Sequence, residues 1–168
     1  AMECFQTQRA IGLRGLGNLL EKTIPNWREF AKETATWNIE KGFGLTIEDM
    51  IRAEATRTRI FEDISEYFRD FDALLLPAAQ VPPFDLSQEW ISEITGIKLD
   101  TYIDWMSVCC MITVTGLPAI SVPGGFTDEG LPVGIQLVGK PNGDLELLKI
   151  ANAYEAITKH HARVPELF

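Results

Sequence analysis

The sequence predicts an α/β protein, and three observations support this fold class. Residues 73–77 form a short, continuous apolar run closed by a proline, which is typical of a strand buried on both faces. Residues 115–159 carry the pattern of two strands joined by a turn and followed by a helix. Residues 47–70 repeat apolar side chains at steps of three and four, which indicates a helix.

The N-terminal part of the chain gives the weakest signal. Residues 1–24 hold three glycines between apolar residues, and no defined structure is predicted for them. Pro25 suits the first turn of a helix, and apolar side chains follow it at helical spacing until Gly42 ends the helix. The expected organisation is therefore a poorly specified segment, residues 1–24, followed by one domain, residues 25–168.

The helix at 47–70 has a clear start. Thr46 is placed to act as its N-cap, and Glu48 and Asp49 lie in the first turn, where the helix dipole favours negative charge. Apolar side chains occupy one face and charged side chains the other, so the helix is expected to pack on one side only. The remaining predicted elements are a long loop at 78–98 with one helical turn around Trp90, a helix at 99–114, strands at 119–122 and 131–139 with a turn at 127–130 between them, and a helix at 144–159.

Composition excludes several functional classes. The 168 residues are 46% apolar and 23% charged, as in ordinary globular domains. With 24 acidic and 15 basic residues, the formal charge of −9 argues against nucleic-acid binding, which depends on neutralising phosphates. No apolar stretch approaches the roughly 18 residues of a membrane span, and the first residues have no apolar signal region. A cytoplasmic protein without a membrane partner is expected.

Three blocks of the sequence resemble the C-terminal region of the amidase-signature family. The blocks are Phe71-Asp-Ala-Leu-Leu-Leu-Pro77, Thr115-Gly-Leu-Pro-Ala-Ile-Ser-Val-Pro123 and Gly130-Leu-Pro-Val-Gly-Ile-Gln-Leu-Val-Gly139. Their order and spacing match those of the family, and the resemblance extends over about residues 25–160. It implies a mixed, largely parallel sheet flanked by helices, present here as an incomplete amidase-signature fold.

The resemblance also implies which chemistry is missing. In that family a serine attacks the amide, activated by a second serine and a lysine, and a Gly/Ser-rich segment upstream of these blocks supplies the serines. In this chain the only Gly-Gly pair is followed by Phe126, no two serines are adjacent, and none of the seven lysines precedes a Gly/Ser-rich loop. A nucleophile and its base must lie within hydrogen-bond reach of each other. We therefore carry no catalytic residue of the family onto this sequence, and no cofactor or metal is implied.

Two other features have the residue types of active sites, and each has a simpler interpretation. His160 and His161 are adjacent, so on a helix their rings point about 100° apart, and a helix C-terminus favours such cationic side chains. Ser121 lies in the middle of a predicted strand, which lacks the sharp turn of a nucleophile elbow. Structural roles are preferred for all three residues.

Cysteines and glycines are also interpreted structurally. Cys109 and Cys110 lie among apolar residues with no nearby histidine, so core packing is preferred to a thiol nucleophile. With Cys4 the chain has three cysteines, which is not a disulfide framework. The glycines at 12, 15 and 17 loosely resemble a phosphate loop, but no Lys-Ser or Lys-Thr follows them.

Four side chains remain as substrate-pocket candidates: Trp90, Tyr102, Trp105 and Met106. They lie in or after the long loop, in a region that helps to shape the substrate pocket in amidase-signature enzymes. Aromatic side chains beside a buried strand can form a pocket wall. The alternative is that they only cover the core.

Two functional interpretations stay open. The first is a C-terminal fragment of an amidase-signature hydrolase that is inactive alone and pairs with the missing N-terminal half. The second is a truncated, non-catalytic paralogue or subunit that serves as a binding or assembly module. Because a shortened fold exposes strand edges, self-association through the sheet edge or through the helix at 47–70 is expected.

Overall fold

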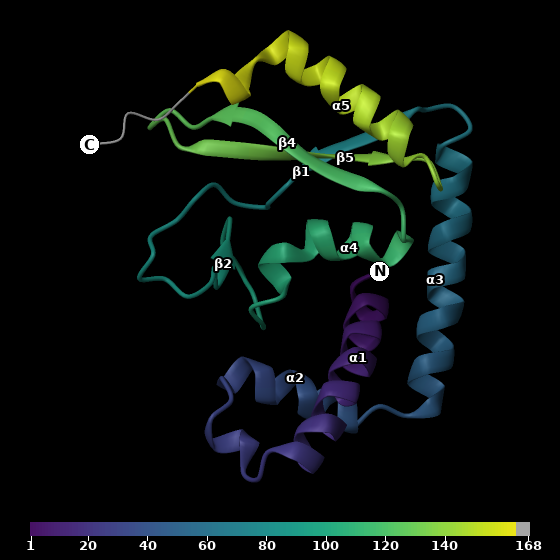
Figure 1. Ribbon diagram of the computed structural model, residues 1–168, viewed down its shortest axis with the longest axis vertical. Coiled ribbons are helices and arrows are strands. Elements are labelled where there is room, and N and C mark those ends of the chain that lie inside the picture. Colours follow the sequence, from purple (N-terminus) through teal and green to yellow (C-terminus); the bar gives the residue numbers. More distant parts are fainter. Residues whose placement is uncertain (164–168) are drawn as a thin grey trace. The chain divides into compact units, whose positions relative to one another are not determined.

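The computed structural model describes residues 1–163, which separate into two compact units. The N-terminal unit is Ala1–Phe61, and the C-terminal unit begins at Glu62. Figure 1 shows the elements in chain order. They are α1 (Met2–Thr23), η1 (Trp27–Glu29), α2 (Glu33–Phe43), α3 (Ile47–Tyr67), β1 (Ala73–Pro77), β2 (Glu93–Ile94), β3 (Ile97–Lys98), η2 (Asp104–Met106), α4 (Ser107–Thr115), β4 (Ala119–Phe126), β5 (Pro132–Gly139), α5 (Asp144–Thr158) and η3 (His160–Ala162).

Helix α1 occupies the segment for which the sequence predicted no defined structure. Its glycines lower helix propensity, but one of them lies at a close contact with α2. A Cβ atom on Gly17 would lie 2.8 Å from the Phe43 ring, and one on Gly42 would lie 2.9 Å from Arg14 Cβ. Packing between α1 and α2 therefore stabilises a helix that local propensity does not favour.

The helix predicted from Pro25 is interrupted. The chain first forms the short η1, preceded by Asn26 in the left-handed region at φ 59°. Lys32 is extended, with ψ 140°, and α2 begins only after it. The uninterrupted helix was a wrong prediction, because apolar spacing alone does not reveal these two backbone breaks.

Helix α3 begins as predicted. The Asp49 backbone N–H donates to Thr46 Oγ1 at 3.1 Å, and the Thr46 backbone N–H donates to Asp49 Oδ2 at 3.0 Å. This reciprocal cap satisfies two donors that a helix start otherwise leaves unpaired. The pKa of Asp49 lies below its usual range, because its carboxylate accepts hydrogen bonds from the Thr46 N–H and hydroxyl and, with a smaller effect, from the Arg52 guanidinium.

The C-terminal unit contains a three-stranded sheet in the order β1-β5-β4, and both pairings are antiparallel. This corrects the largely parallel sheet that the family resemblance implied. Strands β4 and β5 form a hairpin, closed by the Thr127 N–H donating to the Leu131 carbonyl at 2.8 Å, so they must run in opposite directions. Strand β1 adds to the other side of β5, with Leu75 opposite Leu137.

Helices cover both faces of this sheet, as the predicted α/β class requires (Figure 1). On one face, Val122 and Leu137 pack against Leu147 and Ala151 of α5. On the other face, Val138 packs with Phe68 and Leu117, and Ile112 of α4 borders this cluster. Leu137 and Val138 are neighbours in β5, so strand alternation divides the core into two layers.

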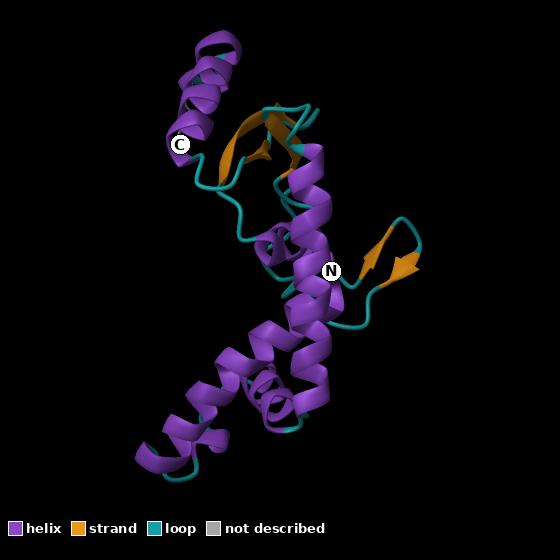
Figure 2. Ribbon diagram, turned by 90° about the vertical axis from the view of Figure 1, so that its right-hand side faces the viewer, coloured by secondary structure: helices purple, strands orange, loops and turns teal. Residues whose placement is uncertain are grey.

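The segment between β1 and α4 differs from its prediction. Residues 93–98 form a small antiparallel hairpin of β2 and β3, which stands apart from the larger sheet (Figure 2). No helical turn forms around Trp90. The helix predicted from residue 99 begins later, with η2 at Asp104 and α4 at Ser107. Before it, Asp104 Oδ2 accepts hydrogen bonds from the Thr101 N–H and hydroxyl, which closes a turn at residues 101–104.

Within residues 1–163, none of the helices combines the length and the apolar character that a membrane span needs.

Candidate functional site

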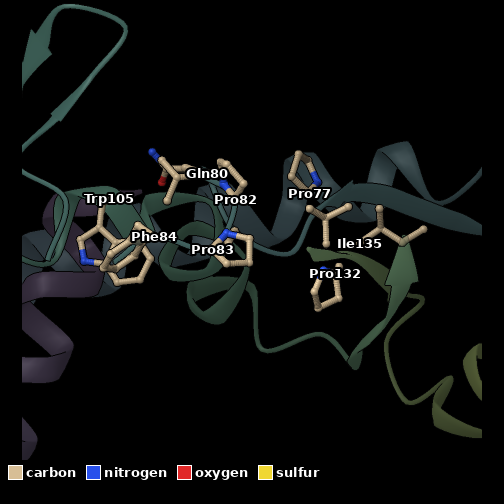
Figure 3. Close-up of a pocket in the computed structure, with 12 residues that line it drawn as sticks. Pro77, Gln80, Pro82, Pro83, Phe84, Trp105, Pro132 and Ile135 are labelled. Atoms are coloured by element: carbon tan, nitrogen blue, oxygen red, sulfur yellow. The ribbon is translucent and has the colours of Figure 1, made fainter. Parts of the chain in front are cut away.

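A pocket of about 600 Å³ lies in the C-terminal unit, where the end of β1, the following loop, η2 and the start of β5 meet (Figure 3). This volume falls in the range of small-molecule sites. We call it the proline pocket, since four prolines line it. Its described lining residues are Pro77, Ala79, Gln80, Val81, Pro82, Pro83, Phe84, Trp105, Pro132, Val133, Gly134 and Ile135.

Strand pairing positions one side of the proline pocket. Pro77 and Ile135 are partners in the β1–β5 register. Just beyond β1, the Ala78 N–H donates to the Gly134 carbonyl at 3.0 Å, and Gln136 Nε2 donates to the Pro77 carbonyl at 3.0 Å. This side of the pocket thus continues the β1–β5 pairing beyond the end of β1.

Gln80 fixes the loop on the other side. Its side-chain oxygen accepts hydrogen bonds from the Ser107 hydroxyl at 2.6 Å and the Val108 N–H at 3.0 Å. The Val108 N–H belongs to the first turn of α4, where backbone donors have no partner within the helix. Gln80 therefore caps α4 and holds the loop against it.

Phe84 and Trp105 form an aromatic corner of the pocket. Their ring centroids lie 5.5 Å apart and their planes are perpendicular, which is the favoured edge-to-face arrangement. Figure 3 shows both rings at one end of the pocket, with Pro77, Pro132 and Ile135 at the other. The lining is apolar at both ends.

The described lining holds no group able to attack an amide. It contains no serine, threonine, cysteine, lysine, histidine or carboxylate. Beside the lining, the Cys109 thiol donates to the Ala78 carbonyl at 2.9 Å. Burial raises the pKa of the Cys109 thiol, which keeps it protonated and weakly nucleophilic. The proline pocket can hold an apolar group, but its side chains supply neither nucleophile nor base.

Of the four pocket candidates from the sequence, only Trp105 is among the described lining residues. Trp90, Tyr102 and Met106 lie outside the lining. Sequence reasoning missed Gln80, Phe84 and the prolines. The one available signal was the clustering of prolines after the buried strand, in the segment Pro77-Ala-Ala-Gln-Val-Pro-Pro-Phe84.

The other candidate residues lie in separate places. Ser121 is on β4 opposite Gln136, and Cys110 is buried in α4. His160 lies in η3 with its ring 6.2 Å from that of Phe126. The glycines at 12, 15 and 17 are inside α1 and form no loop. In the part of the chain that the structure describes, no three His, Cys, Asp or Glu side chains gather into a metal site.

A second hollow, of about 640 Å³, lies in the N-terminal unit and has a polar lining. Three of its charged groups pair with one another: Arg52 Nε lies 3.0 Å from Glu3 Oε1, and Arg52 Nη2 lies 2.7 Å from Asp49 Oδ1. Lys41 Nζ donates to Gln6 Oε1 at 2.6 Å. Because the polar groups of this lining already bind one another, the hollow has less of the character of a binding site than the proline pocket.

Comparison with known proteins gives a consistent family match. The family model for amidases matches residues 5–148. A glutamyl-tRNA(Gln) amidotransferase subunit of Symbiobacterium thermophilum is 40% identical over 119 residues, which cover 69% of this chain and 22% of that protein. The corresponding protein of Myxococcus xanthus is 42% identical over 105 residues, covering 62% of this chain and 20% of that protein. The chain spans about a fifth of the length of these relatives.

Solved structures agree with this match. A bacterial aryl acylamidase of the amidase-signature enzymes superimposes with a TM-score of 0.75 at 25% identity, over 89% of this chain and 32% of that one. A 6-aminohexanoate cyclic dimer hydrolase, solved with its substrate, gives 0.71 at 18% identity, over 96% of this chain and 34% of that one. The second likeness is one of fold alone.

Proposed function

This chain belongs to the amidase family, and from that membership we propose that it forms the C-terminal part of an amidase-signature hydrolase. The complete enzyme would hydrolyse a carboxamide C–N bond by acyl transfer through a serine. The region of residues 25–168 would then be one part of a larger α/β domain, and its small sheet would be extended by strands from the rest of the enzyme. The short coverage of the matched relatives supports this proposal.

One observation supports a division of roles between this chain and the upstream half of the enzyme. The proline pocket has the size and apolar lining of a substrate wall, but its described side chains include no nucleophile and no base. In this proposal the pocket positions one side of the amide, while the attacking serine and its lysine come from the upstream half. Positioning of this kind lowers the barrier only when the reacting groups are also present.

The chain alone should therefore not hydrolyse amides. Its five serines, at 65, 87, 92, 107 and 121, include no adjacent pair. Ser107 donates its hydroxyl to Gln80, and Ser121 lies on a regular strand. Neither position provides a neighbouring base that would activate the hydroxyl.

The test is a hydrolysis assay on the purified chain. With p-nitroacetanilide as substrate, p-nitroaniline release should not exceed the buffer rate. Release that scales with chain concentration, and that is abolished by replacing one of the five serines with alanine, would overturn the proposal. An in-frame Gly/Ser-rich segment with adjacent serines in the gene upstream of Met2 would identify the catalytic half.

A second candidate function is an assembly module, and exposed apolar side chains favour it. Ile47 and Ile51 are 66% and 65% exposed and lie one helical turn apart on α3. Within the described residues, β1 and β4 each pair with a single strand, so each has an open edge. Self-association through these surfaces would give a dimer by light scattering at micromolar concentration, and Ile51→Glu should weaken a dimer formed through α3. A clean monomer would exclude self-association and leave only a different partner.

A further inference from the structure

We propose that the proline pocket binds the uncharged, aromatic part of an amide and excludes zwitterionic amides such as glutamine. The inference rests on the proposed function, because it names the class of substrate that the same pocket takes.

The lining has no charged side chain among the residues that the structure describes. It consists of four prolines, two aromatic residues, four aliphatic residues, one glycine and one glutamine. A ligand's ammonium or carboxylate group would lose water on entering and meet no opposite charge, which is strongly unfavourable. A neutral, apolar group gains from the same transfer.

The lining offers aromatic and proline rings that a flat ligand ring can contact. Phe84 and Trp105 meet edge to face at one end, and Pro77 and Pro132 lie at the other end (Figure 3). Aromatic ligands make favourable offset or edge contacts with such rings, in addition to the gain from burying apolar area. An aliphatic ligand of equal size lacks the ring contacts.

The polar groups of the lining side chains favour an amide carbonyl over an ammonium group. Both lone pairs of the Gln80 side-chain oxygen are used, one by the Ser107 hydroxyl and one by the Val108 N–H. The neutral side-chain donors among the described lining residues are the Gln80 carboxamide N–H groups and the Trp105 indole N–H. Donors of this kind can bind a carbonyl oxygen, and the described lining offers no side-chain acceptor for a cation.

The pocket is also held in place before any ligand arrives. One side continues the β1–β5 pairing through the Ala78 N–H and the Gly134 carbonyl, and Gln80 fixes the loop on the other side. A preformed pocket avoids the entropy cost of ordering loops on binding. The pocket can therefore discriminate between charged and neutral ligands without a conformational change.

The test is ligand titration of the 168-residue chain, followed by two-dimensional ¹⁵N–¹H NMR. The probes are acetanilide, which is neutral and aromatic, N-acetylsulfanilate, which adds a negative charge to the same ring, and L-glutamine. Acetanilide should shift the Trp105 indole signal and the backbone signals of 79–81, 84 and 133–135, with a dissociation constant on the order of 1 mM, as expected for so small a ligand. N-acetylsulfanilate should bind at least roughly tenfold more weakly, and glutamine should leave these signals unchanged.

Matched variants sharpen the test. Trp105→Leu should weaken acetanilide binding by roughly tenfold, whereas Trp105→Phe, which keeps a ring, should weaken it by no more than about threefold. Trp90→Leu is the control, because Trp90 lies outside the lining, and binding should be unaltered. If circular dichroism shows that Trp105→Leu is unfolded, the test uses Trp105→Phe together with the NMR signals that acetanilide shifts in the unaltered chain.

The inference is overturned if glutamine shifts the same signals at the same concentration, if acetanilide shifts none of them, or if Trp90→Leu weakens binding as much as Trp105→Leu. These outcomes are independent of the hydrolysis assay. Hydrolysis of an amide by a serine of this chain would refute the proposed function but would leave the predicted ligand preference untouched. Binding of glutamine in the pocket would refute the predicted ligand preference but would not show that the chain has a nucleophile.

Discussion

The two units of this chain are stabilised in different ways. The C-terminal unit buries apolar side chains on both faces of a sheet, with Val122 and Leu137 on one face and Val138 on the other. The N-terminal unit has no sheet, and its helices approach closely at Gly17 and Gly42. The proline pocket lies in the unit with the layered core.

Surface ion pairs are expected to contribute little to the stability of the N-terminal unit. In the N-terminal unit, Arg28 pairs with Glu21 at 2.6 Å and with Glu40 at 2.8 Å, and all three side chains are nearly half exposed. Exposed pairs of this kind contribute little to stability. The close helix contact is therefore expected to matter more than the ion pairs around it.

The largest expected effect is on the core of the C-terminal unit. Leu137→Ala removes a side chain that is 3% exposed in the central strand and should lower the free energy of unfolding by about 3 kcal/mol. Leu75→Ala, directly opposite on β1 but 56% exposed, is the matched control and should cost less than about 1 kcal/mol. Urea denaturation followed by circular dichroism measures both, and equal losses would contradict the layered core.

The next effect tests the helix contact in the N-terminal unit. Gly42→Ala places a methyl group against the Ala10 carbonyl and 2.9 Å from Arg14 Cβ, so it should destabilise by about 2 kcal/mol despite the better helix propensity of alanine. Gly12→Ala, which meets nothing within 4 Å, should instead stabilise by about 0.5–1 kcal/mol. If Gly42→Ala also stabilises, the close approach of α1 and α2 is wrong.

The smallest effect concerns the cap of α3. The folded-state pKa of Asp49 is lowered by the Thr46 N–H and hydroxyl and by Arg52. A lowered pKa contributes stability above the unfolded-state pKa, near 4, and that stability is lost as the pH falls through the folded-state pKa. Asp49→Asn should therefore destabilise the chain more at pH 7 than at pH 3. Equal effects at both pH values, measured by thermal unfolding, would show that the charge is not involved.

The same difference between the units explains what could be predicted from the sequence. The strand at 73–77 was predicted with its observed bounds, and the strands at 119–122 and 131–139 and the helix at 144–159 were confirmed to within a few residues. All of them have continuous or alternating apolar patterns. Helix α1 was missed because its stability depends on a contact between Gly17 and a side chain some twenty residues away, which local propensity cannot show.

Strand direction and the site were harder to predict. The largely parallel sheet came from the family resemblance, whereas this chain holds a hairpin of β4 and β5 to which β1 adds antiparallel. Trp105 was selected as a pocket residue, but its partner Phe84 was not, because the two meet only after the loop folds back toward η2. Pro132 and Ile135 join them from β5, about fifty residues beyond that loop, and no local pattern links such positions.

Saturation-transfer NMR on a mixture of acetanilide and the purified chain, followed over several days, tests ligand binding and the lack of hydrolysis together. We predict transfer of magnetisation from the chain to the phenyl ring of acetanilide, with no growth of aniline or acetate signals beyond the buffer control. Aniline that accumulates in proportion to the amount of chain would contradict the absence of a nucleophile. A phenyl ring that receives no magnetisation would contradict the apolar, ring-binding pocket.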